Sequence, residues 1–362
     1  MRAVAAVARA AGAPLVLEEI ELDDPRDDEI LVAIAACGVC HTDAKARDGY
    51  GGVRFPVVLG HEGAGTVVEV GSSVRSLVPG DRVLLVSDFC GRCPRCRAGD
   101  TAYCDEGPLR TFGAVRPDGT SRARRGDEAI RASFFGQSAF ATHALASERN
   151  ALKVAPYADL SLLAATTCGM VTGAGAVLDV LTVTPGTRLA VLGAGTVGLA
   201  AVMAAAAAGA EAVVAVDRIP SRLDLARRLG ATDVVDTGRH GDLATALLER
   251  TGGCDAVLDT TGIGRLQQAA VEALAVRGTL GIVGGGDGDG VVLARLMTGG
   301  KSVRGIIQGD ATGTLGLEAL LRLHAAGRFP FEALVRTYPF AAVNEAIGDG
   351  LAGTTVKAVL TF

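Results

Sequence analysis

The sequence has 362 residues and a formal net charge of −5, from 35 basic and 40 acidic side chains. This length predicts about two domains, and 49% apolar with 21% charged residues excludes a disordered chain. The slight acidity argues against binding nucleic acid by charge, and we find no run of the ~20 apolar residues that a membrane span needs. We therefore expect a cytoplasmic protein whose partners include neither nucleic acid nor membrane.

The first 150 residues are rich in short β patterns. Residues 30–36, 66–70 and 82–86 are apolar or β-branched runs, and clusters of Gly, Pro and Asp separate them. Helical periodicity is weak in this part of the chain. The pattern predicts a compact β-rich unit.

From residue 187 onward, apolar β runs alternate with helical stretches. The predicted strands are 188–192, 212–216, 233–236, 256–259 and 279–283. The predicted helices are 196–208, 221–229, 242–250 and 265–276. Such alternation predicts a parallel sheet covered by helices on both faces, and a final strand is expected at 356–361.

A glycine pattern joins the first strand of this region to its first helix. Gly193-Ala194-Gly195-Thr196-Val197-Gly198 has the spacing of a dinucleotide-binding turn, in which a helix N-terminus faces a pyrophosphate. The next strand is followed by Asp217, nineteen residues after Gly198, where a carboxylate can bind both ribose hydroxyls and repel a 2′-phosphate. NAD is therefore favoured over NADP, although Arg218 and Arg222 could accept a phosphate.

Four cysteines lie within fifteen residues, at the spacing C-x2-C-x2-C-x7-C. They are Cys90, Cys93, Cys96 and Cys104. Four thiolates in one loop suit a closed tetrahedral zinc site with a structural role. Two disulfides are an alternative, but they form poorly in a reducing compartment. An iron–sulfur cluster is another, but the sequence lacks the proline that follows the fourth cysteine in ferredoxin-type motifs.

A second set of metal-ligand residues is dispersed. Cys40, His61 and Cys168 each lie in a glycine-rich segment, and two thiolates with one imidazole leave an open fourth position on zinc, which is the catalytic pattern. Their spacing alone does not separate this interpretation from three structural residues, because an isolated buried cysteine is commonly a small apolar side chain.

Five motifs carry a resemblance to a known family. They are Cys-Gly-Val-Cys-His-Thr-Asp at 37–43, Gly-His-Glu-Gly-Ala-Gly at 60–65, the four-cysteine loop, Cys-Gly-Met-Val-Thr-Gly-Ala-Gly-Ala at 168–176 and the glycine pattern. The chain resembles the zinc-dependent alcohol dehydrogenases of the medium-chain dehydrogenase/reductase family nearly end to end. Residues 134–142, Phe-Phe-Gly-Gln-Ser-Ala-Phe-Ala-Thr, further resemble the aryl (benzyl) alcohol dehydrogenase branch.

The resemblance implies an α/β fold with a Rossmann nucleotide-binding domain and a β-rich, GroES-like catalytic domain formed from both chain ends. The implied boundaries are 1–169 with 306–362 for the catalytic domain and 170–305 for the nucleotide-binding domain. It also implies a homodimer or homotetramer that pairs through the nucleotide-binding domain along residues 301–308.

The resemblance also assigns roles to metal-site residues and implies two zinc ions per chain. Cys40, His61 and Cys168 would hold the catalytic zinc, and the four clustered cysteines would hold the structural zinc. Thr42 would offer its hydroxyl to the alcohol. Asp43 would orient His61, and Glu62 would lie behind the metal.

Cofactor contacts are implied in the same way. Asp217 would bind the adenosine ribose of NAD, with Arg222 beside it. His41 and Lys357 fall where the family places cations that bind the pyrophosphate. Lys45 stands where the best-known members carry the histidine that ends a proton relay, so the end of this relay is open.

The implied function is the NAD-linked, reversible oxidation of primary alcohols, aromatic or bulky allylic, to aldehydes. One alternative is a thiol-dependent formaldehyde dehydrogenase or nitrosothiol reductase, which would use the same zinc chemistry. Another is a non-catalytic nucleotide-sensing or zinc-binding module, although a sensor would have no need for a zinc ion with an open position.

Overall fold

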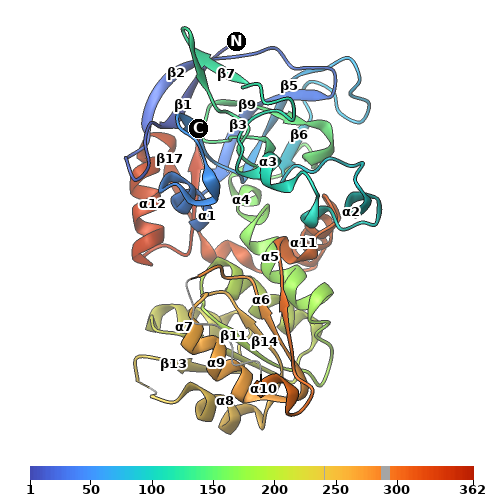
Figure 1. The fold of residues 1–362 in the computed structure, drawn as a ribbon, viewed down its shortest axis with the longest axis vertical. Coiled ribbons are helices and arrows are strands. Elements are labelled where there is room, and N and C mark those ends of the chain that lie inside the picture. Colours follow the sequence, from blue (N-terminus) through green and yellow to red (C-terminus); the bar gives the residue numbers. More distant parts are fainter. Residues whose placement is uncertain (240, 287–293) are drawn as a thin grey trace. The chain divides into compact units, whose positions relative to one another are not determined.

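The structure is a computed structural model that describes residues 1–239, 241–286 and 294–362, and the chain forms two compact units (Figure 1). Unit 1 consists of Met1–Cys168, Thr312–Leu317 and Glu332–Phe362. Unit 2 consists of Gly169–Ala311 and Glu318–Phe331. Both ends of the chain therefore belong to unit 1.

Unit 1 is built on two β-sheets in the described part of the chain. Five strands follow the order β4-β1-β2-β7-β8, and seven form the order β10-β6-β5-β3-β18-β17 with β9 also paired to β3. The strands of the two sheets are β1 Arg2–Ala8, β2 Val16–Leu22, β3 Glu29–Gly38, β4 Val57–Val58, β5 Gly63–Val70, β6 Arg82–Leu85, β7 Ala123–Arg125, β8 Glu128–Ile130, β9 His143–Ser147, β10 Ala151–Lys153, β17 Val335–Pro339 and β18 Lys357–Thr361. The strands predicted at 30–36, 66–70, 82–86 and 356–361 correspond to β3, β5, β6 and β18.

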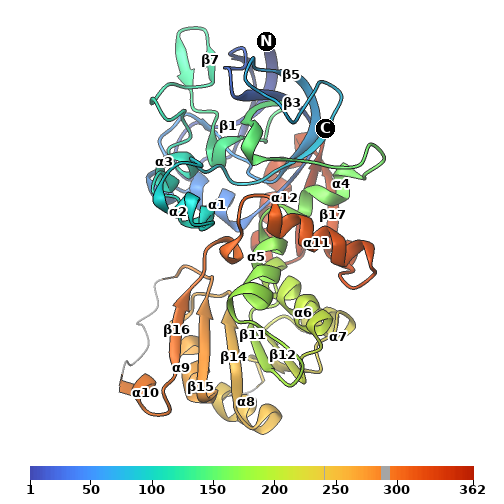
Figure 2. The ribbon, with the colours of Figure 1, turned by 90° about the vertical axis from the view of Figure 1, so that its right-hand side faces the viewer.

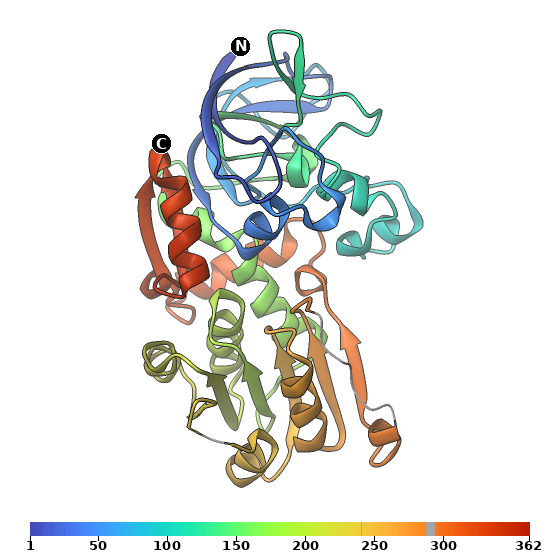
Figure 3. The same cartoon turned by 60° about the vertical axis from the view of Figure 1, so that its left-hand side comes forward.

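The helices of unit 1 are mostly short. They are α1 His41–Arg47, α2 Pro94–Arg97, α3 Gly107–Thr111, α4 Leu160–Leu163 and α12 Val343–Ala352, with 3-10 turns η1 Tyr50–Gly52, η2 Thr101–Tyr103, η3 Phe134–Gly136, η4 Glu148–Asn150, η5 Ala164–Thr166, η8 Phe331–Leu334 and η9 Phe340–Ala342. The longer α12 lies beside β17 and β18 (Figure 3). Because β18 also pairs with β3, the C-terminal strand lies next to the segment that leads into α1.

Unit 2 contains a six-stranded sheet with the order β13-β12-β11-β14-β15-β16 (Figure 2). Every neighbouring pair in it is parallel. The strands are β11 Arg188–Leu192, β12 Ala212–Asp217, β13 Asp233–Asp236, β14 Cys254–Asp259, β15 Leu274–Ile282 and β16 Ser302–Gly305. The parallel sheet predicted from the alternating pattern is thus confirmed.

The helices that accompany this sheet fall into two packed groups: α6 contacts α5 and η6, whereas α8 contacts α9. The elements are α5 Gly169–Gly175, the π-helical η6 Ala176–Val180, α6 Thr196–Ala208, α7 Pro220–Arg228, α8 Leu243–Thr251, α9 Gly264–Ala273, α10 Ala294–Met297 and η7 Gln308–Asp310, and α11 Leu315–Ala325 has residues in both units. In the described ranges, no single helix is long and apolar enough to cross a membrane, while one bent pair, Leu160–Thr166 with Gly169–Val180, passes that test on length and composition alone.

Burial explains why this part of the chain could be predicted closely. Residues 189–192 of β11 are all fully buried, as expected for a central parallel strand that is covered on both faces. Helix α6 is rich in Ala because it packs closely: a Cβ on Gly173 of α5 would lie 2.1 Å from the carbonyl oxygen of Val197. Only small residues allow two helix backbones to approach in this way.

One predicted helix is too long. The helix expected at 265–276 ends at Ala273, because the backbone at Leu274 is extended and enters β15. Leu274 pairs with Cys254 of β14, and the pairing then shifts register before Ala256. The apolar residues 274–276 would also fit a helix, but here they are part of strand β15.

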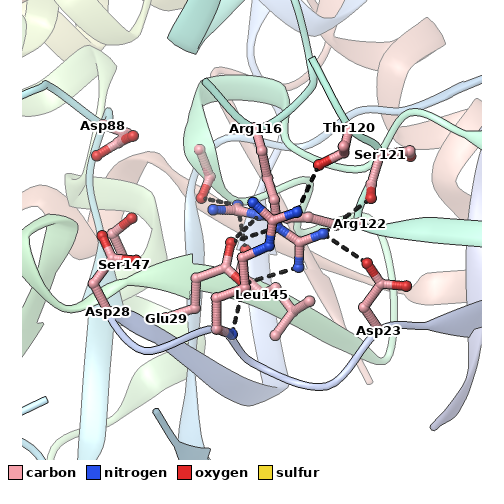
Figure 4. A network of polar contacts seen from close by, with 12 residues as sticks. Asp23, Asp28, Glu29, Asp88, Arg116, Thr120, Ser121, Arg122, Leu145 and Ser147 are labelled. Atoms are coloured by element: carbon pink, nitrogen blue, oxygen red, sulfur yellow. Dashed lines mark hydrogen bonds and ion pairs between the residues drawn. The ribbon is translucent and has the colours of Figure 1, made fainter. Parts of the chain in front are cut away.

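A buried ion network fixes the loop after α3 to the first residue of β3 (Figure 4). The Glu29 carboxylate accepts hydrogen bonds from Arg116 Nη2 at 2.9 Å and from Arg122 Nε at 3.0 Å, and all three side chains are buried. Arg122 Nη1 also donates to the carbonyl oxygens of Gly136 and Leu145. Burial alone would raise the pKa of Glu29, but the two guanidinium groups outweigh it and lower this pKa to about 2.

We expect Glu29→Gln to lower the free energy of unfolding by about 3 kcal/mol at pH 7, because it removes the carboxylate that pairs with the buried Arg122 and leaves the buried Arg116 with only the partly exposed Asp23. The depressed pKa also predicts that the Glu29 contribution is complete above about pH 4.5 and is lost as the pH falls towards 2. Urea unfolding at several pH values measures both effects. Glu19→Gln is the matched control, since the Arg2–Glu19 pair is exposed; an equal loss in both variants would contradict the expectation.

Candidate functional site

Three separate segments of unit 1 bring their metal-ligand side chains together. Cys40 precedes α1, His61 and Glu62 lie between β4 and β5, and Cys168 follows η5. One potential ligand atom from each of the four lies within 4.8 Å of all the others. The Nε2 atom of His61 is 3.3 Å from the Sγ atom of Cys168. The three ligands predicted from the sequence therefore converge, and Glu62 lies beside them.

Asp43 holds this cluster in place from the first turn of α1. One oxygen of its fully buried carboxylate lies 2.9 Å from His61 Nδ1 and accepts the Gly60 N–H at 3.0 Å, and the other accepts the Cys40 N–H at 3.0 Å. A carboxylate at Nδ1 directs the Nε2 atom towards the two thiols, which is how second-sphere carboxylates orient metal-binding imidazoles. The position of Asp43 agrees with the role that the resemblance implies.

The ligand groups compete for protons. The hydrogen bond with Cys168 lowers the pKa of the Cys40 thiol well below its usual value, while the same contact and burial raise the pKa of Cys168. Burial works against a charged His61, but the Asp43 carboxylate and the neighbouring Cys40 together outweigh burial and raise the pKa of this imidazole. A divalent cation would take the place of the shared protons, as metal ions do when they bind thiol and imidazole ligands.

Glu62 and Lys357 form a buried ion pair next to the cluster, and Lys357 Nζ also donates to the carbonyl oxygen of Val39 at 3.3 Å. Burial raises the pKa of Glu62 to about 7, although Lys357 acts in the opposite direction. The carboxylate also lies tightly against β3: a Cβ on Gly38 would be 2.0 Å from Glu62 Oε2. A side chain at residue 38 would therefore force the Glu62 carboxylate to move.

The donor set fits a zinc ion. Two thiols and an imidazole are the nitrogen and sulfur ligands that zinc prefers, and three protein ligands leave a position for substrate. Glu62 Oε1 is buried and has no hydrogen-bond partner among the described residues. A cation at the cluster would offset this uncompensated oxygen.

The four clustered cysteines form a second group, whose sulfur atoms lie within 4.8 Å of one another. All eight cysteines of the chain are free thiols. Backbone N–H groups of Cys90, Arg92, Cys93 and Cys96 donate to sulfur atoms of this group at 3.3 to 3.4 Å. The Cys96 N–H lowers the pKa of Cys93 to about 7, and burial raises that of Cys96 to about 12. Four sulfurs with amide donors fit a closed tetrahedral zinc site.

We expect the purified chain to hold two zinc equivalents, and Cys168→Ser or Cys93→Ser to hold one each, because each change removes a ligand from a different cluster. Elemental analysis after dialysis measures the metal content. Cys254→Ser is the matched control, since Cys254 is a buried cysteine that belongs to neither cluster. Two equivalents in Cys168→Ser would contradict the assignment of the first cluster.

In unit 2, the glycine pattern forms the turn between β11 and α6. Gly193 has a φ of 93°, a conformation that other residues rarely adopt. A Cβ on Gly198 would lie 1.8 Å from the Gly193 carbonyl oxygen, whereas one on Gly195 would have no atom within 4 Å. The turn thus needs glycine at residues 193 and 198. The open space at Gly195 lets a phosphate approach the N-terminus of α6, as in dinucleotide-binding turns.

Asp217 lies at the end of β12, beside this turn. Its carboxylate accepts the N–H groups of Ala194 at 2.7 Å, of Arg218 at 2.7 Å and of Ile219 at 2.9 Å. Arg222 lies in the first turn of α7, and its Nε is buried without a hydrogen-bond partner in the described structure. Thr196 and Val197 begin α6, as predicted.

The remaining predicted residues lie on α1 and β18. His41, the first residue of α1, is exposed, and Thr42 Oγ1 lies 3.7 Å from Cys40 Sγ. Lys45 is exposed on the same helix, and its Nζ lies over the Tyr50 ring. Lys357 is buried with Glu62, so its role as a pyrophosphate-binding cation stays a prediction. Sequence reasoning missed Gly38, for which the only signal was the glycine inside the Cys-Gly-Val-Cys motif.

Comparison with known proteins agrees with this architecture. Residues 26–156 match the alcohol dehydrogenase GroES-like domain, and residues 196–323 match the zinc-binding dehydrogenase domain. The chain is 42% identical to a geraniol dehydrogenase of Castellaniella defragrans, over 99% of this chain and 98% of the relative. It is 34% identical to an S-(hydroxymethyl)glutathione dehydrogenase of Escherichia coli, over the whole of both chains. The crystal structure of benzyl alcohol dehydrogenase from Acinetobacter calcoaceticus superposes with a TM-score of 0.95 at 37% identity, covering 100% of this chain and 99% of that one.

A parallel Rossmann-type sheet, a GroES-like unit and two thiol clusters together define a metal-dependent oxidoreductase. The chain belongs to the zinc-dependent alcohol dehydrogenases of the medium-chain dehydrogenase/reductase family. The predicted fold class and family are confirmed.

Proposed function

We propose that this chain catalyses the NAD-linked, reversible oxidation of primary alcohols that are aromatic or bulky and allylic. The observation that carries the proposal is the convergence of Cys40, His61 and Cys168 on one point with Thr42 beside it. The geraniol and benzyl alcohol dehydrogenases that the chain resembles act on alcohols of these two kinds.

Each side chain of the cluster would have a separate role in this reaction. Cys40, His61 and Cys168 would hold a zinc ion, which supplies Lewis acidity towards the oxygen of an alcohol or aldehyde when bound. Thr42 Oγ1 would accept a hydrogen bond from the alcohol hydroxyl and pass the proton outward as its own O–H gives up a proton to the relay. Asp43 would keep His61 in the tautomer whose Nε2 faces the cluster. The four-cysteine group has no open position, so we assign it a structural role.

NAD is the proposed cofactor because Asp217 brings a carboxylate to the glycine turn. Gly193, Gly195, Thr196, Val197 and Gly198 would receive the pyrophosphate, and Asp217 with Arg222 would bind the adenosine ribose. A carboxylate there repels a 2′-phosphate. His41 and Lys357 would add positive charge near the pyrophosphate.

We expect Asp217→Asn to reduce the preference for NAD over NADP by roughly 10- to 100-fold, because it removes the charge that repels the 2′-phosphate. The ratio of kcat/KM for the two cofactors measures the preference. Asp236→Asn is the matched control, since Asp236 also ends a strand of this sheet, next to β12. An unchanged ratio in Asp217→Asn would contradict the assignment.

The proposed reaction is tested by NADH formation with NAD and a panel that includes benzyl alcohol and geraniol. Cys40→Ser should lose this activity and keep NADH affinity, since Cys40 lies in unit 1 and the glycine turn in unit 2. Activity on no alcohol of the panel, or full activity in Cys40→Ser, would overturn the proposal.

A thiol-dependent formaldehyde dehydrogenase is the second candidate, because the chain also resembles S-(hydroxymethyl)glutathione dehydrogenases. It is less favoured, since those relatives are less similar than the geraniol dehydrogenase, 34% to 35% against 42% identical. Turnover of formaldehyde only when a low-molecular-weight thiol is present would favour it over the alcohol substrates.

We further propose that the GroES-like catalytic domain comprises 1–169 and 306–362 and the nucleotide-binding domain 170–305. The chain would act as a homodimer or homotetramer that pairs along 301–308, where β16 is an edge strand with all four residues exposed. A cytoplasmic location would suit it, because six of its eight cysteines lie in the two clusters and must stay reduced to bind metal.

A further inference from the structure

Residues 133–138 form a tight turn that is buried along its whole length, which we call the 133–138 turn. Three of its residues have positive φ angles: 52° at Phe135, 76° at Gly136 and 54° at Ser138. A phenylalanine rarely adopts this conformation, because its Cβ crowds the backbone. Ser138 keeps the turn closed: its Oγ accepts the Phe134 N–H at 2.7 Å and donates to the Val58 carbonyl oxygen at 2.6 Å.

The unusual backbone places aromatic rings against the imidazole of His61. The Phe135 ring stacks on it, with centroids 4.5 Å apart and an interplanar angle of 29°. The Phe134 ring meets the same imidazole edge-on, with centroids 5.7 Å apart. Phe112 lies edge-on to both phenylalanine rings.

The same turn also binds the backbone that follows this imidazole, on both sides of Glu62. Gln137, which is fully buried, donates from Nε2 to the His61 carbonyl oxygen at 2.9 Å and accepts the Gly63 N–H at its Oε1 at 2.9 Å. One turn therefore holds both the main chain and the ring face of His61. Asp43 holds the Nδ1 edge of the ring and the N–H of the preceding Gly60, and it does not contact the ring face.

We propose that the 133–138 turn is a positioning element for the metal ligand His61, in which Phe135 fixes the tilt of the imidazole and Gln137 fixes its backbone. A hydrogen bond to Nδ1 leaves the ring free to tilt about that bond, and a stacked flat face removes this freedom. The strained conformation of Phe135 persists because a relaxed one would take the ring off the imidazole. This inference rests on the proposed function, since it takes His61 as a ligand of the catalytic zinc.

The test is the rate at which a chelator removes zinc from the Cys40, His61 and Cys168 cluster. Cys168→Ser, which keeps only the four-cysteine ion, supplies the baseline. Phe135→Leu should release this zinc about 10-fold faster than the wild-type chain, the scale typical for lost support of a metal ligand. Phe135→Tyr, which keeps the flat face, should stay near the wild-type rate. With cobalt in this cluster, the ligand-field absorption should also shift in Phe135→Leu and not in Phe135→Tyr.

Two further variants separate the loss of the ring at residue 135 from misfolding and from a general loss of core packing. Phe135→Asn also lacks the ring but suits a positive φ, so it should fold even where Phe135→Leu does not, and it should release zinc as fast. Phe140→Leu is the matched control, because Phe140 is a fully buried ring of the same apolar core. Wild-type release in both Phe135→Leu and Phe135→Asn, or equal acceleration in Phe140→Leu, would overturn the inference alone. A wild-type chain with zinc only at the four cysteines would overturn the proposed function as well.

Discussion

The carboxylate of Asp43 is the contact on which the arrangement of the site depends. It accepts hydrogen bonds from the Cys40 N–H, the Gly60 N–H and His61 Nδ1, so it ties the start of α1 to the segment between β4 and β5. It is fully buried, and a buried carboxylate is tolerated only when such donors satisfy it. The segments that carry Cys40 and His61 are thereby held in position without a metal ion. Metal binding then requires less ordering of the chain.

Charged side chains also anchor the four-cysteine loop to the β-rich part of unit 1. Glu106 pairs with Arg92 and Arg110, Arg110 pairs with Asp88, and Asp88 pairs with Arg149. Arg110 and Asp88 are buried, so their mutual neutralisation matters more than that of the exposed pairs around them. A structural ion in this loop would therefore stabilise a segment that is already fixed to the core.

Local patterns in the sequence predicted much of this molecule. Strand β11 and helix α6 begin and end at the predicted residues, because a buried parallel strand and a glycine-capped helix both leave a local signature. The four-cysteine group is equally local. The family resemblance, and no spacing rule, connected Cys40, His61 and Cys168, which are up to 128 residues apart.

Contacts between residues far apart in the sequence could not be predicted from local patterns. One basic run contains Arg122, Arg124 and Arg125, yet only Arg122 of the three is buried. Its guanidinium group pairs with Glu29, which lies 93 residues away in the sequence. The pairing of Glu62 with Lys357 likewise depends on β18 lying next to β3. The positive φ of Phe135 has no signature in its residue type, which normally avoids that conformation.

The absence of a side chain at Gly38 has a consequence for the placement of Glu62 beside the metal-ligand cluster. Glu62 belongs to the same group of potential ligands as Cys40, His61 and Cys168, and its carboxylate occupies the space that a methyl group on Gly38 would fill. A methyl group there would force the Glu62 carboxylate out of its present position beside Lys357. The missing carbon atom on β3 thus allows the Glu62–Lys357 pair to form directly beside the three ligands.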